Sequence, residues 1–246
     1  MTGTVRTCLV TGGSRGIGAA VATRLELEGH RVARVSRTGA GASERSMSVR
    51  ADLTDDAQLE SAIQEVEDRW GPVEVLVANA GAAAESPIVD ETDQTWQGLL
   101  DLNLSVPFRL MRRTLPAMTA AGWGRIVAIG SVASLRGEPR LGAYTAGKHG
   151  LLGLVRSVAA EVAKDGVTVN AVCPGYVDTA LTRRTVKEIA RRLDESEDRA
   201  LLRLARRHPI RRLVRPDEVA DAVRFCIGNA ALNGQSIVLD GGSVQS

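Results

Sequence analysis

The stretch TCLVTGGSRGIGAAVATRLELEG, residues 7–29, decides the fold. A short apolar run leads into a glycine-rich turn, and a helical pattern follows it. Glycine at such a turn lets the backbone approach a pyrophosphate, and the free N–H groups at the helix start attract its charge. A turn that binds no ligand is the alternative, and the rest of the chain disfavours it. The predicted cofactor-binding residues here are Gly12, Ser14, Arg15, Gly16, Ile17 and Gly18.

Strands and helices alternate along the remaining sequence. Strands are expected at 7–11, 31–36, 46–51, 73–78, 125–131, 167–172 and 236–240, and helices at 16–28, 55–70, 92–120, 143–165, 179–206 and 216–228. Most strand segments are continuous apolar runs, which is typical of parallel strands covered on both faces. The pattern predicts an α/β fold with a doubly wound, parallel, seven-stranded sheet. We expect a single domain over residues 1–246 with a substrate lid at about 179–215.

The composition argues against several classes of partner. Of 246 residues 44% are hydrophobic and 3% aromatic, and the formal net charge is +2. Such a charge gives no general attraction to nucleic acid or membranes. Cys8, Cys173 and Cys226 lack metal-ligand spacing, so we expect buried, reduced thiols and no metal site. With no signal pattern and no apolar run of ~18 residues, we expect a cytoplasmic protein with no nucleic-acid or membrane partner.

The end of the second strand bears on the choice of cofactor. An acidic residue there would bind the adenosine ribose hydroxyls of NAD. This chain has VSRT, with Ser36 and Arg37 and no acid. Arg15 adds a second guanidinium from the glycine turn, and two guanidinium groups suit a 2′-phosphate. The sequence therefore predicts NADP rather than NAD, and the alternative is that both arginines are simply solvated.

Tyr144 and Lys148 lie four residues apart at the start of an apolar helical segment, so they share one helix face. An ammonium group near a phenol favours the phenolate and lowers the pKa of the tyrosine. Such a shift would bring Tyr144 toward the pH at which general acid–base catalysis is efficient. Ser131 ends a strand at the ligand-binding edge. Asn103 interrupts an apolar helical run, and the alternative for it is a purely structural link between two backbone segments.

Several motifs occur together and in order, and with them the chain resembles the short-chain dehydrogenase/reductase family. They are TGGSRGIG (11–18), ADL (51–53), ANAG (78–81), CPGYVDT (173–179) and LDGG (239–242). The resemblance implies a Rossmann-type fold. It also implies cofactor contacts from Asp52, Leu53, Asn79, Ala80, Gly81, Tyr144, Lys148, Pro174, Gly175, Val177 and Thr179. One departure is Ala78, where the family motif has asparagine, and another is the short segment 37–52.

The resemblance also implies a catalytic tetrad of Asn103, Ser131, Tyr144 and Lys148. Tyr144 would exchange a proton with the substrate oxygen, and Ser131 would position that oxygen. Lys148 would lower the pKa of Tyr144 and hold the nicotinamide ribose. Asn103 would anchor a water that links Lys148 to solvent. Helices equivalent to 92–120 and 143–165 usually form subunit contacts in the family, which implies a homotetramer.

Substrate choice in the family depends largely on the segment after PGYVDT. Between Thr182 and Pro216 there are eleven arginines and one lysine against five acids. One interpretation is a solvated amphipathic lid with Leu193, Leu201, Leu202 and Leu204 inward. The other is a basic rim that attracts an anionic carrier of the substrate, such as coenzyme A or an acidic acyl carrier protein.

Overall the chain is most similar to reductases of 3-oxoacyl thioesters in fatty-acid or polyketide metabolism. This similarity implies NADPH-dependent reduction of a ketone to a secondary alcohol on a small-molecule substrate, free or linked to a carrier. Only Arg125 and Lys164 are candidates for the carrier-docking positions that the family would use. The alternatives are an NAD(P)-dependent dehydrogenase of another secondary alcohol, a polyketide ketoreductase, and a non-catalytic dinucleotide sensor. A nucleic-acid binder is disfavoured because few aromatic residues are available to stack on bases.

Overall fold

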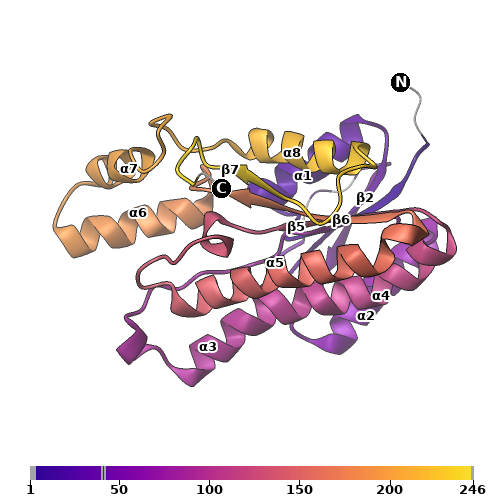
Figure 1. The fold of residues 1–246 in the computed structure, drawn as a ribbon, viewed down its shortest axis with the longest axis horizontal. Coiled ribbons are helices and arrows are strands. Elements are labelled where there is room, and N and C mark those ends of the chain that lie inside the picture. The colour runs from indigo at the N-terminus through magenta and orange to yellow at the C-terminus, as the bar shows by residue number, and fades with distance from the viewer. Residues whose placement is uncertain (1–3, 40, 42, 245–246) are drawn as a thin grey trace.

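The computed structural model describes residues 4–39, 41 and 43–244. It contains one parallel seven-stranded sheet, in the order β3-β2-β1-β4-β5-β6-β7, which confirms the predicted fold (Figure 1). The predicted domain of residues 1–246 includes 1–3, 40, 42, 245 and 246, which lie outside the described residues. The strands are β1 (Thr7–Thr11), β2 (Arg31–Ser36), β3 (Ser46–Arg50), β4 (Val75–Ala78), β5 (Gly124–Ile129), β6 (Val167–Pro174) and β7 (Ser236–Leu239).

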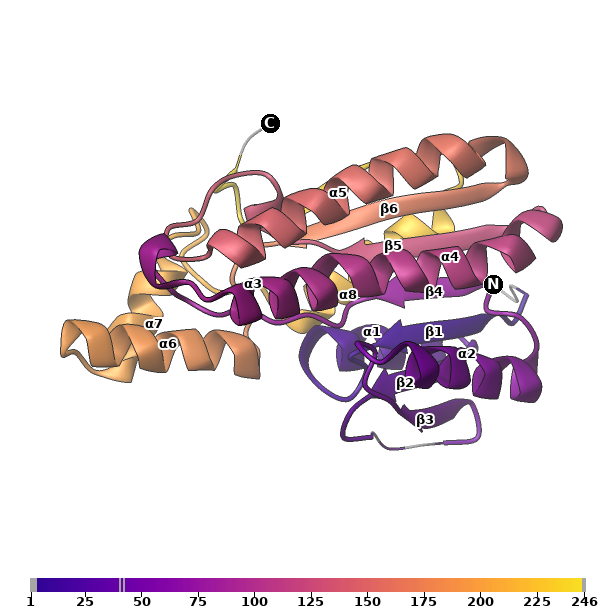
Figure 2. The same ribbon diagram turned by 90° about the horizontal axis from the view of Figure 1, so that it is seen from below.

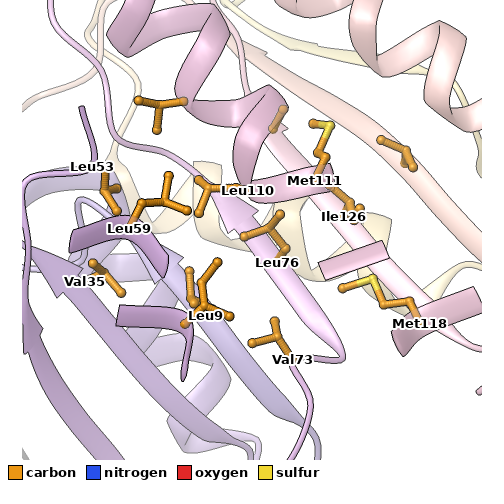
Figure 3. Packing of buried hydrophobic residues seen from close by; sticks show 14 of the residues in the cluster. Leu9, Val35, Leu53, Leu59, Val73, Leu76, Leu110, Met111, Met118 and Ile126 are labelled. Carbon is orange, nitrogen blue, oxygen red and sulfur yellow. The ribbon is translucent and has the colours of Figure 1, made fainter. Parts of the chain in front are cut away.

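Helices cover both faces of the sheet. On one face lie α1 (Gly16–Leu27) and α8 (Pro216–Gly228), which pack against each other. On the other face lie α2 (Asp56–Trp70), α4 (Val106–Ala120) and α5 (Gly142–Val162) (Figures 1 and 2). Side chains alternate between the two cores along each strand. In β1, for example, Leu9 packs toward α2 and α4 (Figure 3). Cys8 and Val10 pack toward α1 and α8.

The sheet order positions the binding site. β1 pairs with β2 on one side and with β4 on the other, so the direction of chain progression reverses between β1 and β4. Ligands of doubly wound sheets bind at such a reversal, beyond the carboxyl ends of the strands. The strands in Figure 2 point toward the segment that contains α6 (Ala180–Leu193) and α7 (Glu197–Ala205).

The helix predicted at 92–120 is interrupted. It consists of α3 (Asp93–Leu100), a π-helical turn over Asp101–Ser105, and α4. The physical reason is Pro107, which has no N–H to donate to the carbonyl of Asn103 four residues earlier. A π turn is rare and is found mainly at functional sites. Asn103 lies in this turn and is fully buried.

The helix predicted at 179–206 is also broken. Asp194 adopts a left-handed conformation, with a φ of 49°, and separates α6 from α7. Leu204 is buried between the two helices, and Leu201 packs against the same cluster. Leu193 and Leu202, predicted to point inward, are instead 47% and 56% exposed. Leu193 is the last residue of α6 and the helix ends at Asp194, so one continuous helical pattern over 179–206 predicts the wrong inward residues.

The three cysteines are buried and form no disulfide, as predicted. Within the described ranges, no group of three or more histidine, cysteine and acidic side chains could hold a metal ion. The same residues include no helix that is both long and apolar enough to span a lipid bilayer.

Candidate active site

A cleft of about 790 Å³ opens at the carboxyl ends of the strands. It runs from the glycine turn and the end of β2, past the end of β4, to the start of α5 and to α6. The structure brings nearly all of the predicted site residues to its wall. They are Gly12, Ser14, Arg15, Gly16, Ile17, Arg37, Asp52, Leu53, Asn79, Ala80, Gly81, Asn103, Ser131, Tyr144, Lys148, Pro174, Gly175, Val177 and Thr179.

Gly18 is the exception, because it does not line the cleft. A Cβ atom at this position would lie 2.3 Å from the carbonyl oxygen of Gly12 and 2.6 Å from Nδ2 of Asn79. Gly18 therefore lets α1 pack closely against the turn, which is a recognised role of the last glycine in dinucleotide-binding turns. The prediction that Gly18 itself contacts the cofactor stays a prediction, and the packing role is what the structure adds.

The ANAG segment holds the glycine turn in place. The side chain of Asn79 donates to the carbonyl oxygen of Thr11 at 2.8 Å, and its backbone N–H donates to Oγ1 of Thr11 at 2.9 Å. The backbone N–H of Ala80 donates to the same hydroxyl at 3.0 Å. Ala78, where the family motif has asparagine, is buried in the sheet and pairs with Ala128. The bonds that tie this segment to the turn therefore come from Asn79 and Ala80.

The adenosine end of the cleft suits a phosphate. Oγ of Ser36 is buried and has no hydrogen-bond partner among the described residues, although buried hydroxyls normally have one. Arg15 and Arg37 are both exposed on the wall of the cleft that Ser36 also lines, and Arg37 directly follows the serine. The carboxylate of Asp52 accepts from the hydroxyl and the N–H of Thr54, and these bonds lower the pKa of Asp52. A donor hydroxyl without a partner and two guanidinium groups fit the 2′-phosphate of NADP.

The segment after β6 closes the opposite wall. The hydroxyl of Thr179 caps α6, and a Cβ atom on Gly16 would lie 3.2 Å from the Thr179 methyl group. The lid therefore begins in contact with the glycine turn. His208, which the sequence analysis did not single out, is buried behind Gly175. Its Nε2 accepts from the N–H of Tyr176 at 3.0 Å and so fixes this strand end.

Lys148 is buried on α5 and fixed to the end of β5. Its Nζ donates to the carbonyl oxygen of Ile129 at 2.8 Å and lies 5.8 Å from the centre of the Tyr144 ring. Ser131 follows Ile129 by two residues, and its Oγ accepts from the N–H of Ala133 at 3.1 Å. The end of β5 and the first turns of α5 thus hold the hydroxyl, the phenol and the amine in one rigid unit.

The electrostatics of this unit differ from the sequence-based expectation. Burial raises the pKa of Tyr144, and a hydrogen bond with Ser131 works in the opposite direction. Burial also lowers the pKa of Lys148 to about 8. Desolvation is the largest cause of the shift, so the pKa of Tyr144 moves in the direction opposite to the one expected from its spacing to Lys148. The phenol keeps its proton at neutral pH.

Asn103 combines the two roles that the sequence left open. Its Nδ2 donates to the carbonyl oxygens of Ala82 and Leu99, at 2.8 and 2.9 Å, so it does tie two backbone segments together. Its Oδ1 is buried without a hydrogen-bond partner in the described part of the chain. A Cβ atom on Gly81 would lie 2.9 Å from this Oδ1 and 3.6 Å from Nζ of Lys148. The free acceptor of Asn103 and the amine of Lys148 therefore both lie next to Gly81.

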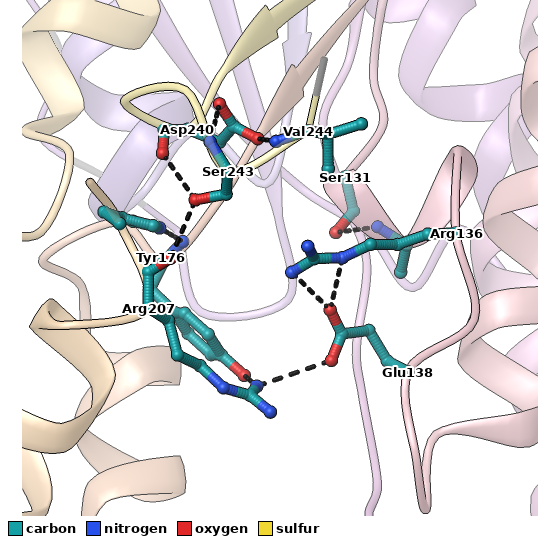
Figure 4. A network of polar contacts seen from close by, with 10 residues as sticks. Ser131, Arg136, Glu138, Tyr176, Arg207, Asp240, Ser243 and Val244 are labelled. Carbon is teal, nitrogen blue, oxygen red and sulfur yellow. Dashed lines mark hydrogen bonds and ion pairs between the residues drawn. The ribbon is translucent and has the colours of Figure 1, made fainter. Parts of the chain in front are cut away.

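A polar network at the substrate end of the cleft was not predicted. Glu138, whose side chain is only 8% exposed, binds Arg136 at 2.9 Å and Arg207 at 3.4 Å (Figure 4). Arg207 also donates to the hydroxyl of Tyr176 at 2.6 Å. The network links the loop after Ser131 to the lid. The sequence carried no signal for it, because Arg207 is far from both Glu138 and Tyr176 along the chain.

Many lid arginines form ion pairs. These pairs support the first interpretation of this segment, in which it is a solvated amphipathic lid. The paired residues are Arg183, Arg191, Arg192, Arg203, Arg207, Arg212 and Arg215. Arg125, one of the two candidate docking residues, is only 6% exposed. Its guanidinium donates to the carbonyl oxygens of Gly124, Gly166 and Ile227. Arg125 is therefore structural and does not offer a docking surface.

Known proteins resemble the chain over nearly its whole length. The 3-oxoacyl-[acyl-carrier-protein] reductase MabA of Mycobacterium tuberculosis is 39% identical over 239 residues, covering 96% of this chain and 92% of that protein. The reductase FabG of Escherichia coli is 35% identical and covers 95% of each chain. The crystal structure of actinorhodin polyketide ketoreductase with NADPH superposes with a TM-score of 0.91, 32% identity and 97% coverage of both chains. The family described as short chain dehydrogenase matches residues 6–190. The chain therefore belongs to the short chain dehydrogenase family.

Proposed function

We propose that the protein reduces a 3-oxoacyl thioester to the 3-hydroxyacyl thioester with NADPH. The observation that carries this proposal is the convergence at one end of the cleft. There the buried Lys148 and the unpartnered Oδ1 of Asn103 both lie next to Gly81, and both residues line the same cleft as Tyr144 and Ser131. The names of the relatives, 3-oxoacyl-[acyl-carrier-protein] reductases and a polyketide ketoreductase, support the substrate class.

Each residue of this end has a distinct role in the proposal. NADPH, when bound, supplies the hydride to the carbonyl carbon. The hydroxyl of Ser131 positions the substrate oxygen, and Tyr144 donates its proton to that oxygen. Lys148 binds the nicotinamide ribose and passes a proton toward Tyr144. Asn103 holds the water that returns a proton to Lys148 from solvent.

The pKa of Tyr144 suits the direction of reduction. A general acid must carry its proton at the working pH, and burial raises the pKa of this phenol above its ordinary value. Lys148, with a pKa of about 8, is still charged at neutral pH but exchanges its proton readily. The pKa of Lys148 is therefore lower than that of Tyr144. After the tyrosine has donated its proton to the substrate, the lysine can return a proton to it.

Replacement of Arg37 by alanine is expected to weaken the preference for NADPH. A hydrogen bond to a charged group contributes about 1.5–3 kcal/mol, or roughly ten- to 150-fold in affinity. We expect kcat/KM for NADPH to fall by about tenfold or more, with little change for NADH. The measurement is initial-rate kinetics with each cofactor at a fixed thioester concentration.

Arg31 is a matched control for Arg37, because it is exposed at the start of β2, whereas Arg37 directly follows the end of that strand. Arg31→Ala should leave both cofactors unaffected. An equal or better kcat/KM with NADH in the unchanged protein would refute the assignment of NADP.

The reductase function is tested by NADPH oxidation with acetoacetyl-CoA, a carrier-linked 3-oxoacyl thioester and a panel of small ketones. Turnover of the thioesters above the small ketones supports the proposal. Turnover of ketones alone would favour a dehydrogenase of another secondary alcohol. Binding of NADPH with no turnover of any substrate would favour a dinucleotide sensor instead.

We further propose that the protein assembles as a homotetramer. Phe108 on α4 and Phe225 on α8 are 43% and 52% exposed, on opposite faces of the sheet. Burial of two such faces against copies of the same chain would remove both rings from water.

A further inference from the structure

Helix α6 carries a ridge of positive charge along its outer side. The helix contains four arginines and one lysine against one glutamate. Arg183, Lys187 and Arg191 are spaced by four residues, so they form one row, and Arg184 lies beside that row. We call these four residues the cationic ridge, and all of them are exposed. Helix α7 differs, since it has two arginines against two acids.

The ridge borders the entrance to the cleft. Leu181, Arg184, Thr185 and Glu188 of the same helix line the cleft, whereas Arg183, Lys187 and Arg191 do not. The buried side of α6, with Val186, Ile189 and Ala190, packs against the lid cluster. The helix therefore has three sides: one toward the lid core, one toward the substrate and one toward solvent.

The ridge is only partly neutralised by the protein itself. Arg183 pairs with Asp178 at 3.0 Å and Arg191 pairs with Glu188 at 2.7 Å, and the two arginine side chains are 68% and 78% exposed. Exposed pairs of this kind contribute about 0–1 kcal/mol, so an incoming acid can replace either partner. Arg184 and Lys187 form no ion pair within the described residues.

The side of the molecule that carries Arg125 and Lys164 offers a poorer surface. Arg125 is buried with its guanidinium bound to backbone carbonyls. Lys164 is exposed, but Asp165 and Glu161 flank it in the sequence. Of the two candidate docking residues only Lys164 is exposed, whereas the ridge presents four exposed cations beside the cleft.

We propose that the cationic ridge of α6 is the docking surface for an acidic acyl carrier protein that delivers the thioester. This inference rests on the proposed reductase function. The partner would place an acidic helical face against Arg183, Lys187 and Arg191, and its acyl arm would enter the cleft past Arg184. Complementary charge of this kind accelerates encounter and orients the partner.

The test compares three forms of the same 3-oxoacyl group: linked to the carrier protein, to coenzyme A and to N-acetylcysteamine. The variant is Arg183→Glu with Lys187→Glu, which leaves the cleft wall unchanged. We expect kcat/KM for the carrier-linked substrate to fall about tenfold or more. The value for the N-acetylcysteamine thioester should stay the same. Lys164→Glu, a charge reversal at the other candidate surface, should leave all three substrates unaffected.

The other outcomes contradict the proposal in different ways. An equal loss on coenzyme A and carrier substrates would mean that the ridge binds nucleotide phosphates. An unchanged carrier rate in the variant, or a loss in Lys164→Glu, would place docking elsewhere. If the charge-reversed variant also reduces the N-acetylcysteamine thioester more slowly, the neutral variant Arg183→Gln with Lys187→Gln is measured next. The proposal requires this neutral variant to lose activity on the carrier-linked substrate alone, and a loss on all three substrates would contradict it. Failure of the unchanged protein on all thioesters would refute the reductase function itself.

Discussion

Replacement of Tyr144 by phenylalanine is expected to reduce kcat for thioester reduction by about 10²–10⁴-fold, the usual contribution of a positioned general acid. The ring and its packing remain, and only the proton donor is lost. NADPH affinity, measured by fluorescence titration, should change by less than about threefold. The loss should fall on kcat, because the missing interaction forms only as the substrate oxygen gains negative charge.

Tyr176→Phe is the matched control, because Tyr176 is the chain's other tyrosine and also lines the cleft. Its hydroxyl accepts a hydrogen bond from Arg207 and takes no part in proton transfer in our proposal. We expect Tyr176→Phe to retain kcat within about tenfold. Comparable losses in both variants would show that the cleft is sensitive to any lost hydroxyl, and the acid would then have to be sought elsewhere.

Replacement of Gly18 by alanine is expected to have the largest effect on the cofactor turn. The new methyl group would lie 2.3 Å from the Gly12 carbonyl, so α1 or the turn must move. Overpacking against backbone costs about 1–3 kcal/mol of unfolding free energy. The same shift displaces the N–H groups that bind the pyrophosphate. We therefore expect a lower melting temperature and at least a tenfold weaker NADPH affinity.

Gly98→Ala provides the comparison, since Gly98 lies on α3 and an added Cβ there would contact nothing within 4 Å. This change should be neutral or stabilise the protein by up to about 1 kcal/mol, because alanine favours helix. If Gly18→Ala binds NADPH normally, the close contact between α1 and the turn is not needed for cofactor binding.

The sequence predicted the sheet and the cleft well for a clear physical reason. Strand segments buried on both faces are continuous apolar runs, and the turn after β1 needs glycine because Gly12 and Gly16 adopt positive φ angles. Motif residues such as Asn79 and Thr179 therefore fall where parallel strands must end. The packing role of Gly18 is visible only once the neighbouring carbonyl is in place.

Features that depend on partners distant in sequence could not be predicted. The network around Glu138 joins residues from the loop after β5 to Arg207, which lies just after the end of α7. The π turn at Asn103 follows from Pro107, which the continuous apolar pattern at 92–120 concealed. The pKa of Tyr144 depends on how deeply the phenol is buried, and helix spacing carries no information about burial depth.

The pH dependence of kcat/KM for thioester reduction at saturating NADPH tests the central claim most directly. The claim is that Tyr144 donates its proton to the substrate oxygen and that a charged Lys148 then supplies the proton that restores the phenol. Because the pKa of Lys148 is lowered to about 8 and that of Tyr144 is raised, the lysine loses its proton first as pH increases. The account predicts a constant rate between about pH 6 and 7.5 and a fall approaching tenfold per pH unit above about 8. A rate that rises from pH 7 to pH 9 would contradict it, because the phenolate rather than the phenol would then be the active form.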